Sequence, residues 1–131
     1  MKNPPNRKLM ATRVLIVEDD PINLLVAKKL LEKHFEITSA TNGYQALEVI
    51  EKFDFDVILM DINLGDDALD GTEVMHKIKA NPNKKHIKIY AVTSYALPED
   101  RDRFLNFGFD YYFPKPINKD LIIEKIREDI T

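Results

Sequence analysis

The chain has 131 residues, 44% of them apolar and 31% charged, with a formal net charge of −3 and no cysteine. This length and apolar content are typical of one domain with one core. The mixed charge argues against a nucleic-acid partner, and the lack of cysteine excludes disulfides and thiolate metal sites. No apolar run approaches the ~20 residues that a membrane span needs. We therefore expect no membrane partner and a cytoplasmic location.

The chain begins with a basic, proline-containing segment, and we expect residues 1–12 to be a disordered tail ahead of a domain over residues 13–131. Residues 14–17 form an apolar, β-branched run that is typical of a strand covered on both faces. Three acids follow, of which Asp20 is the expected N-cap of a helix that begins at Pro21 and runs to about Lys33. Ile22, Val26 and Leu30 are the stripe expected to face the sheet.

The middle of the chain repeats this alternation. Residues 36–40 predict a second strand and residues 44–52 a second helix. The apolar run over residues 55–61 predicts a third strand that ends on a single carboxylate, Asp61. A loop rich in glycine and acids follows, and a third helix, capped by Asp70, ends near Asn81 and Pro82.

The last third supplies two more strands and two more helices. Residues 87–92 predict a strand that ends at Thr93, and Pro98 begins a helix that stops at Gly108. Residues 111–113 predict a short strand, closed by the sequence Pro-Lys-Pro that contains Lys115. Isoleucines spaced four residues apart mark the last helix, at positions 122, 126 and 130.

Five strands alternating with five helices predict an α/β fold with a doubly wound parallel sheet. The flavodoxin-like strand order 2-1-3-4-5 fits this length best. Ligands in such sheets bind at the carboxyl ends of the strands, at the switch point between strands one and three. Glu18, Asp19 and Asp61 are expected there, with Thr93 and Lys115 at neighbouring strand ends.

Such a group of acids indicates a cation site. Two unit charges ~4 Å apart repel by roughly 4 kcal/mol at an effective dielectric constant of about 20. Lys115 supplies one compensating charge, and an all-oxygen set of ligands without histidine or cysteine favours Mg²⁺. A carboxylate such as Asp61 can act as a nucleophile that forms an aspartyl phosphate, with a metal and a lysine neutralising the phosphoryl group.

These five residues, in this order along the chain, make residues 12–130 resemble the receiver domain of two-component response regulators. The resemblance implies a phosphoprotein that works in phosphorelay signal transduction. It is either a single-domain regulator or a receiver from a hybrid histidine kinase. It is not an enzyme, because it catalyses only its own phosphorylation and dephosphorylation.

The resemblance also implies a role for each matching residue. Asp61 is the phosphoacceptor, and Glu18, Asp19, Asp61 and the backbone carbonyl of Asn63 hold Mg²⁺. Thr93 and Lys115 contact the phosphoryl group. Thr93 and Tyr112 form the conformational switch, and the peptide bond between Lys115 and Pro116 is expected to be cis.

Two kinds of protein partner follow from the same resemblance. A histidine kinase or a histidine phosphotransfer protein donates the phosphoryl group. A downstream target binds the face formed by the fourth helix, the fifth strand and the fifth helix.

The sequence departs from the family pattern beyond the acceptor. The loop from Gly65 to Asp70 is longer and more acidic than usual, and we expect it to affect partner choice. Tyr95, two residues after Thr93, is expected to slow attack by water on the phosphoryl group.

Two other functions fit parts of this pattern. A metal-dependent phosphatase or phosphotransferase of the haloacid-dehalogenase kind also uses an aspartate nucleophile. Such enzymes need a second acid two residues on, where this chain has Asn63. A degenerate receiver that serves only as a binding module would not need all five site residues.

Overall fold

We analysed a computed structural model of the chain, which describes residues 12–64, 70–94 and 97–130. The predicted disordered tail, except for Thr12, lies outside these residues. So do Gly65 to Leu69 of the acidic loop and Tyr95.

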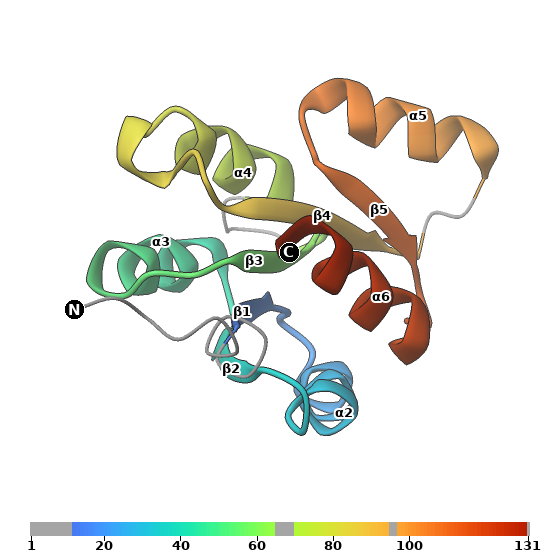
Figure 1. Cartoon of the computed structure of the whole chain (residues 1–131). Helices are drawn as coiled ribbons and strands as arrows, with labels where there is room; N and C mark the ends of the chain where they lie inside the picture. Colours follow the sequence, from blue (N-terminus) through green and yellow to red (C-terminus); the bar gives the residue numbers. More distant parts are fainter. Residues whose placement is uncertain (1–11, 65–69, 95–96, 131) are drawn as a thin grey trace.

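The described residues form a five-stranded parallel sheet in the order β2-β1-β3-β4-β5 (Figure 1), which confirms the predicted fold class. The strands are β1 (Arg13–Val17), β2 (Glu36–Ala40), β3 (Val57–Asp61), β4 (Lys88–Thr93) and β5 (Tyr111–Pro114). The α-helices of the described part are α2 (Pro21–Leu31), α3 (Gly43–Lys52), α4 (Gly71–Lys79), α5 (Pro98–Phe107) and α6 (Lys119–Ile130), and η1 (Pro82–Lys84) is a short 3₁₀ turn.

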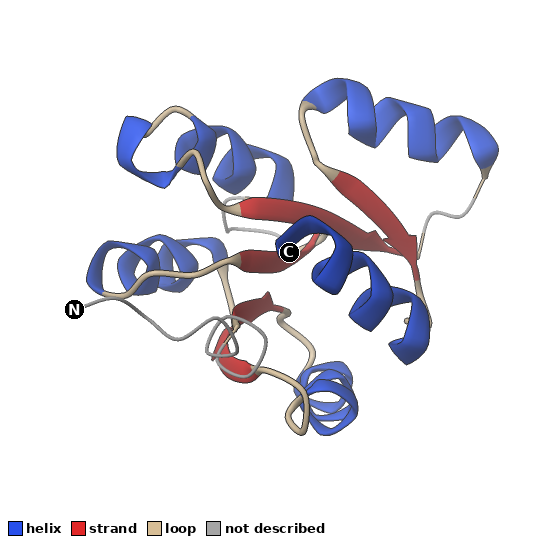
Figure 2. Ribbon diagram, in the orientation of Figure 1, coloured by secondary structure: helices blue, strands red, loops and turns tan. Residues whose placement is uncertain are grey.

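Helices cover both faces of the sheet (Figure 2). Residues of each central strand alternate between two apolar clusters. In β3, for example, Ile58 and Met60 pack on the side of α3, α4 and α5, whereas Val57 and Leu59 pack on the side of α2 and α6. Burial on both faces explains why these strands are continuous apolar runs in the sequence.

The predicted capping residues are confirmed. The side chain of Asp20 accepts hydrogen bonds from the backbone N–H groups of Ile22 and Asn23, at 2.8 and 3.1 Å. Asp70 accepts one from Glu73, whose own side chain accepts from the backbone N–H of Asp70, so the two residues form a capping box.

The predicted buried stripe of α2 is wrong in two of its three positions. Ile22 is 73% exposed and Val26 is 50% exposed, and only Leu30 packs partly against the core. The buried residues of α2 are Ala27 and Leu31. The helix is apolar on most of its circumference, so a spacing of four residues did not identify the face that meets the sheet.

Gly71 is the point where α4 meets the end of β3. Its N–H donates to the carbonyl of Ile62 at 3.0 Å, and a β-carbon on it would lie 2.3 Å from the backbone oxygen of Asp61. No side chain fits there without moving the backbone that carries Asp61.

We therefore predict that Gly71→Ala lowers the free energy of unfolding by about 1–3 kcal/mol, the usual cost of overpacking. Urea denaturation measures this effect, with Thr72→Ala at the neighbouring, partly exposed position as the control. A Gly71→Ala protein as stable as the wild type would show that the close approach costs nothing.

Candidate functional site

The carboxyl edge of the sheet brings together charged side chains from three strand ends. Glu18 follows β1, Asp61 ends β3 and Lys115 follows β5. The Lys115 Nζ donates to Glu18 Oε1 at 2.9 Å and lies 3.4 Å from Asp61 Oδ2. The predicted meeting of these three residues is thus present in the structure.

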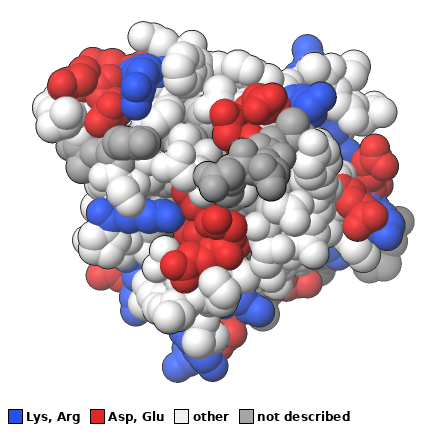
Figure 3. Space-filling model, turned by 180° about the vertical axis from the view of Figure 1, so that it is seen from behind, with Lys and Arg blue, Asp and Glu red and all other residues white. Residues whose placement is uncertain are grey.

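Asp19 completes an acidic cluster with Glu18 and Asp61. One carboxylate oxygen from each of the three residues lies within 4.8 Å of the others. Glu18 and Asp61 are only 6% and 5% exposed, whereas Asp19 is exposed to solvent. The cluster therefore has two buried members and one that faces solvent. Figure 3 shows a face of the molecule on which acidic side chains gather in a central patch.

Backbone N–H groups fix the orientation of both buried carboxylates. Asn63 donates to Asp61 Oδ1 at 3.2 Å, and Asp20 donates to Glu18 Oε2 at 3.1 Å. With Lys115 on the other oxygen in each case, both oxygens of each carboxylate have a partner that fixes their position.

The charges of the cluster are only partly balanced. Burial raises the pKa of Asp61 to about 7, and the neighbouring Glu18 adds to the rise, while Lys115 and the Asn63 N–H oppose it. Burial lowers the pKa of Lys115, but Glu18 and Asp61 together raise it above its usual value. A further cation beside these acids would relieve their repulsion.

Thr93 lies at the same edge, at the end of β4. It is buried, and it follows Val92, which is the register partner of Asp61. Its carbonyl accepts a hydrogen bond from the backbone N–H of Lys115 at 2.8 Å, which fixes the start of the loop after β5. The peptide bond between Lys115 and Pro116 is cis, as predicted.

Tyr112 lies away from the cluster, on β5. Its ring is buried and stacks on Phe104 of α5, with centroids 5.9 Å apart and planes inclined by 15°. Burial raises the pKa of Tyr112, and the negative charge of Asp100 adds to the rise. The structure thus holds Tyr112 in an inward position, and its role as a switch stays a prediction.

An open cleft surrounds the cluster and contains residues that the sequence reasoning did not single out. Asn23 and Ser94 line it, together with the cluster, Asp20, Asn63 and Lys115. Asn23 belongs to the first turn of the helix after β1 and Ser94 follows Thr93. Both residues lie shortly after a predicted strand end near the switch point, and this position could have identified them from the sequence as residues that line the site.

The donors of this cleft fit a hard divalent cation. They are carboxylate oxygens, and the cleft also contains Asn63, whose backbone carbonyl was the predicted fourth ligand. Among the described residues this is the one group of three or more acidic or histidine side chains with metal-site spacing.

Within residues 12–64, 70–94 and 97–130, no helix has the length and apolar character needed to cross a membrane.

Known proteins are similar to this chain in sequence. The response regulator DivK of Brucella anthropi is 34% identical over 119 residues, which cover 90% of this chain and 95% of that protein. Hybrid signal transduction histidine kinase I of Dictyostelium discoideum is 38% identical over 130 residues, which cover 94% of this chain. The chain spans 7% of that kinase, and 12% of each of two GacS sensor kinases.

A solved structure agrees with this comparison. The receiver domain of sensor histidine kinase PA1611 from Pseudomonas aeruginosa superposes with a TM-score of 0.81 at 31% identity, covering 92% of this chain and 98% of that one. That structure has a magnesium ion coordinated in its active site cleft. The family model of the response regulator receiver domain matches residues 14–127. The chain therefore belongs to the receiver domain family of two-component signalling.

Proposed function

We propose that Asp61 is the residue that accepts the phosphoryl group, within a receiver unit that spans residues 13–131. The observation that carries this proposal is the position of Lys115, 3.4 Å from a buried Asp61 that also belongs to the acidic cluster. A carboxylate held between a cation and a metal-type site has both a nucleophilic oxygen and the means to neutralise incoming phosphate.

The proposed reaction is a transfer between two side chains. An oxygen of Asp61 attacks the phosphorus of a partner's phosphohistidine, a P–O bond forms and the P–N bond breaks. The imidazole leaves with the bonding electron pair and takes a proton, and Asp61 becomes an acyl phosphate. Lys115 stays close enough to pair with the new phosphoryl oxygens.

We also propose Mg²⁺ as the cation of the cluster, held by Glu18, Asp19, Asp61 and the carbonyl of Asn63. When bound, Mg²⁺ neutralises charge on the transferring phosphoryl group. Lys115 interacts with two of these carboxylates, so its ammonium group neutralises part of the charge of the cluster.

Asn63 argues against the phosphatase alternative. An enzyme of the haloacid-dehalogenase kind needs an acid at this position, and the neutral amide side chain of Asn63 cannot serve as one. We propose that the chain catalyses only its own phosphorylation and dephosphorylation. Loss of the acyl phosphate then depends on water reaching Asp61 through the open cleft.

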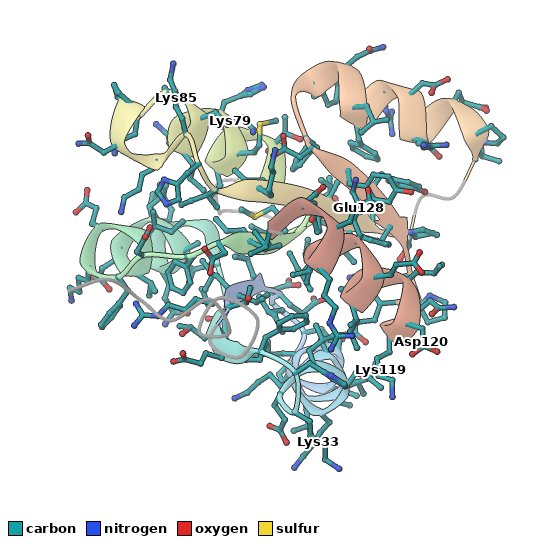
Figure 4. All side chains as sticks on the ribbon, viewed as in Figure 1. Lys33, Lys79, Lys85, Lys119, Asp120 and Glu128 are labelled. Carbon is teal, nitrogen blue, oxygen red and sulfur yellow. The ribbon has the colours of Figure 1, made fainter. Side chains whose placement is uncertain are left out.

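Thr93 and Tyr112 are the proposed switch, and α5, β5 and α6 form the proposed target-binding face. A groove of ≈ 390 Å³ lies on this face. Tyr111 to Pro114 of β5 form its floor, Arg101 of α5 lines one side, and Leu121, Glu124, Lys125 and Glu128 of α6 line the other; Glu128 is labelled in Figure 4. A signalling partner would meet aromatic rings flanked by both signs of charge.

The donor protein is proposed to cover a different surface, next to Asp61. Ile22, Leu25 and Val26 of α2 are 73%, 56% and 50% exposed. Val26 also lines a mostly apolar pocket of ≈ 120 Å³ that extends to Asp61 and Lys115. A partner that brings a phosphohistidine to Asp61 must approach this edge of the sheet, so the occupant we propose for the apolar rim of α2 is an apolar surface of the kinase or phosphotransfer protein beside its histidine.

Phosphorylation by a small donor tests the central proposal. Acetyl phosphate with Mg²⁺ is expected to add one phosphoryl group per chain, measured by intact mass, and Asp61→Asn is expected to abolish the addition. Asp102→Asn, at an exposed acid on α5, is the matched control. Unchanged phosphorylation of Asp61→Asn, or rapid turnover of a small phosphate ester, would overturn the proposal.

The charge imbalance predicts the sign of a stability change. In Mg²⁺-free buffer at neutral pH, Asp61→Asn is expected to raise the free energy of unfolding by about 1–3 kcal/mol, since it removes repulsion within a buried cluster. Lys115→Met is expected to lower it. Addition of Mg²⁺ should stabilise the wild type by mass action and should stabilise Asp61→Asn less. Urea denaturation with and without EDTA measures all three effects, and a destabilised Asp61→Asn would contradict the account.

Replacing apolar residues on the α2 surface by charged ones distinguishes an effect on partner docking from an effect on phosphorylation itself. Ile22→Lys combined with Leu25→Glu is expected to slow transfer from a phosphorylated histidine partner by about tenfold or more, the loss of roughly 1.4 kcal/mol of interface energy. Phosphorylation by acetyl phosphate should stay at the wild-type rate. Tyr44→Glu, an exposed position on α3, is the control. If the double variant accepted phosphate from the partner normally, α2 would not be the docking surface.

A further inference from the structure

The surface where α4 leads into β4 is strongly basic, and the proposed phosphoryl chemistry does not use it. Between Glu73 and Glu99 the sequence contains five lysines and two histidines but no acid, although the whole chain has a net charge of −3. These seven residues lie between His76 in α4 and Lys88, the first residue of β4, with η1 among them. An acidic chain thus carries one region of concentrated positive charge.

In the described part of the chain, four of these lysines have no acidic partner. Asp110 pairs with Lys79 at 2.8 Å, and Asp54 pairs with His86 at 2.7 Å, so the nearby acids are already taken. Among residues 12–64, 70–94 and 97–130, no ion pair involves the other four lysines, which we call the lysine corner: Lys77, Lys84, Lys85 and Lys88. Their charges are therefore available to a ligand from outside the chain.

The lysine corner lies at the amino edge of the sheet, away from the acidic cluster. Lys88 begins β4 and Thr93 ends it, and five residue steps of about 3.3 Å each place the two edges roughly 17 Å apart. Figure 4 shows Lys85 beside α4, on the other side of the molecule from Lys33 and Lys119. Because the Debye length is only about 8 Å at physiological ionic strength, the acidic cluster cancels little of the positive field at the corner.

Two exposed phenylalanines border the corner. Phe53 is 57% exposed and precedes Asp54, whose carboxylate binds the His86 ring. Phe107 is 44% exposed, and its carbonyl accepts a hydrogen bond from His76 Nε2 at 2.8 Å. The surface thus offers apolar rings beside positive charges, so it fits a partner with both acidic and apolar side chains.

The kind of cation and the charge of the whole molecule favour a short acidic segment of a protein over nucleic acid or anionic lipid. The corner contains lysine and no arginine, and lysine lacks the planar fork with which arginine binds phosphate through two hydrogen bonds. A nucleic-acid duplex or a membrane also extends past the corner, over surfaces of a chain whose net charge is −3. A short segment contacts the corner alone and avoids this repulsion.

We propose that the lysine corner, together with Phe53 and Phe107, is a docking site for a short acidic segment of a partner protein that also carries apolar side chains. A segment bound at the amino edge of the sheet leaves Asp61 accessible at the carboxyl edge. The proposal is independent of the phosphoacceptor function, because it uses no residue of the acidic cluster.

A model peptide tests the charged part of this surface. The probe is a fluorescein-labelled peptide rich in glutamate and leucine, and its binding to the full chain is followed by fluorescence anisotropy. Lys77→Gln combined with Lys85→Gln is expected to raise the Kd by about fivefold or more, because two of the four unpaired charges are lost. Lys33→Gln combined with Lys119→Gln changes the net charge equally, at exposed positions on another surface, and should bind like the wild type.

Equal Kd values for these two double variants would overturn the proposal. So would equal binding of a control peptide in which glutamine replaces every glutamate. Circular dichroism of both double variants confirms that they are folded.

The apolar part is tested by Phe53→Ser. This change is expected to raise the Kd for the peptide by about threefold while leaving its dependence on salt unchanged, because the ring carries no charge. Tyr44→Ser, at a 62% exposed aromatic of the same helix, is the control. An unchanged Kd in Phe53→Ser would show that the partner needs no apolar side chain at this position, and would overturn that part of the proposal.

Other polyanions decide the class of partner. A DNA duplex and vesicles of phosphatidylserine and phosphatidylcholine are titrated with the chain at the same salt concentration as the peptide. Both are expected to bind more weakly than the peptide. If either bound more tightly, and lost this binding in the variant with Lys77→Gln and Lys85→Gln, the corner would be a nucleic-acid or lipid site and the acidic-segment proposal would be wrong.

Discussion

The meeting of three acids with one lysine at the carboxyl edge of the sheet is the constraint on which the site depends. Glu18 and Asp61 are buried beside each other, and Lys115 interacts with both of them and so offsets part of their repulsion. The single charge of Lys115 does not fully offset burial and the neighbouring Glu18, and these two effects raise the pKa of Asp61. The net negative charge that remains on this cluster favours a divalent cation, which is the basis of the proposed Mg²⁺ site and of the proposed phosphoryl transfer to Asp61.

The sheet order is what makes the cluster possible. Glu18, Asp61 and Lys115 are far apart in the sequence, yet the order β2-β1-β3-β4-β5 places the ends of their strands along one edge. Gly71 lets α4 approach the backbone of Asp61, and the N–H groups of Asp20 and Asn63 orient the carboxylates. The sheet and these backbone contacts thus fix the geometry of the cluster, while the exposed apolar residues of α2 and the groove along β5 are the surfaces that we propose for two different partners.

The sequence predicted the fold, and the meeting of Glu18, Asp61 and Lys115 at one edge of the sheet, for a physical reason. Strands buried on both faces are continuous apolar runs, so the residue that ends each run, such as Asp61 or Thr93, is located to within a residue or two. The orientation of α2 was not predictable in this way, because its apolar residues surround most of the helix and Ile22 and Val26 are exposed. Asp100, a buried acid, was also missed, although its contacts lie at standard helix spacings: Leu97 is three residues before it, at the N-cap, and Arg103 is three residues after it. The predicted effects of the acidic loop and of Tyr95 concern residues beyond those that the structure describes.

The most direct test of the central claim is to identify the residue that carries the phosphoryl group. An acyl phosphate on an aspartate is reduced by borohydride to homoserine, which tandem mass spectrometry locates within the chain. After treatment with acetyl phosphate and Mg²⁺, the account predicts homoserine at position 61, with none after treatment in EDTA. Homoserine at Asp19 or at any other acid, with Asp61 unmodified, would contradict it.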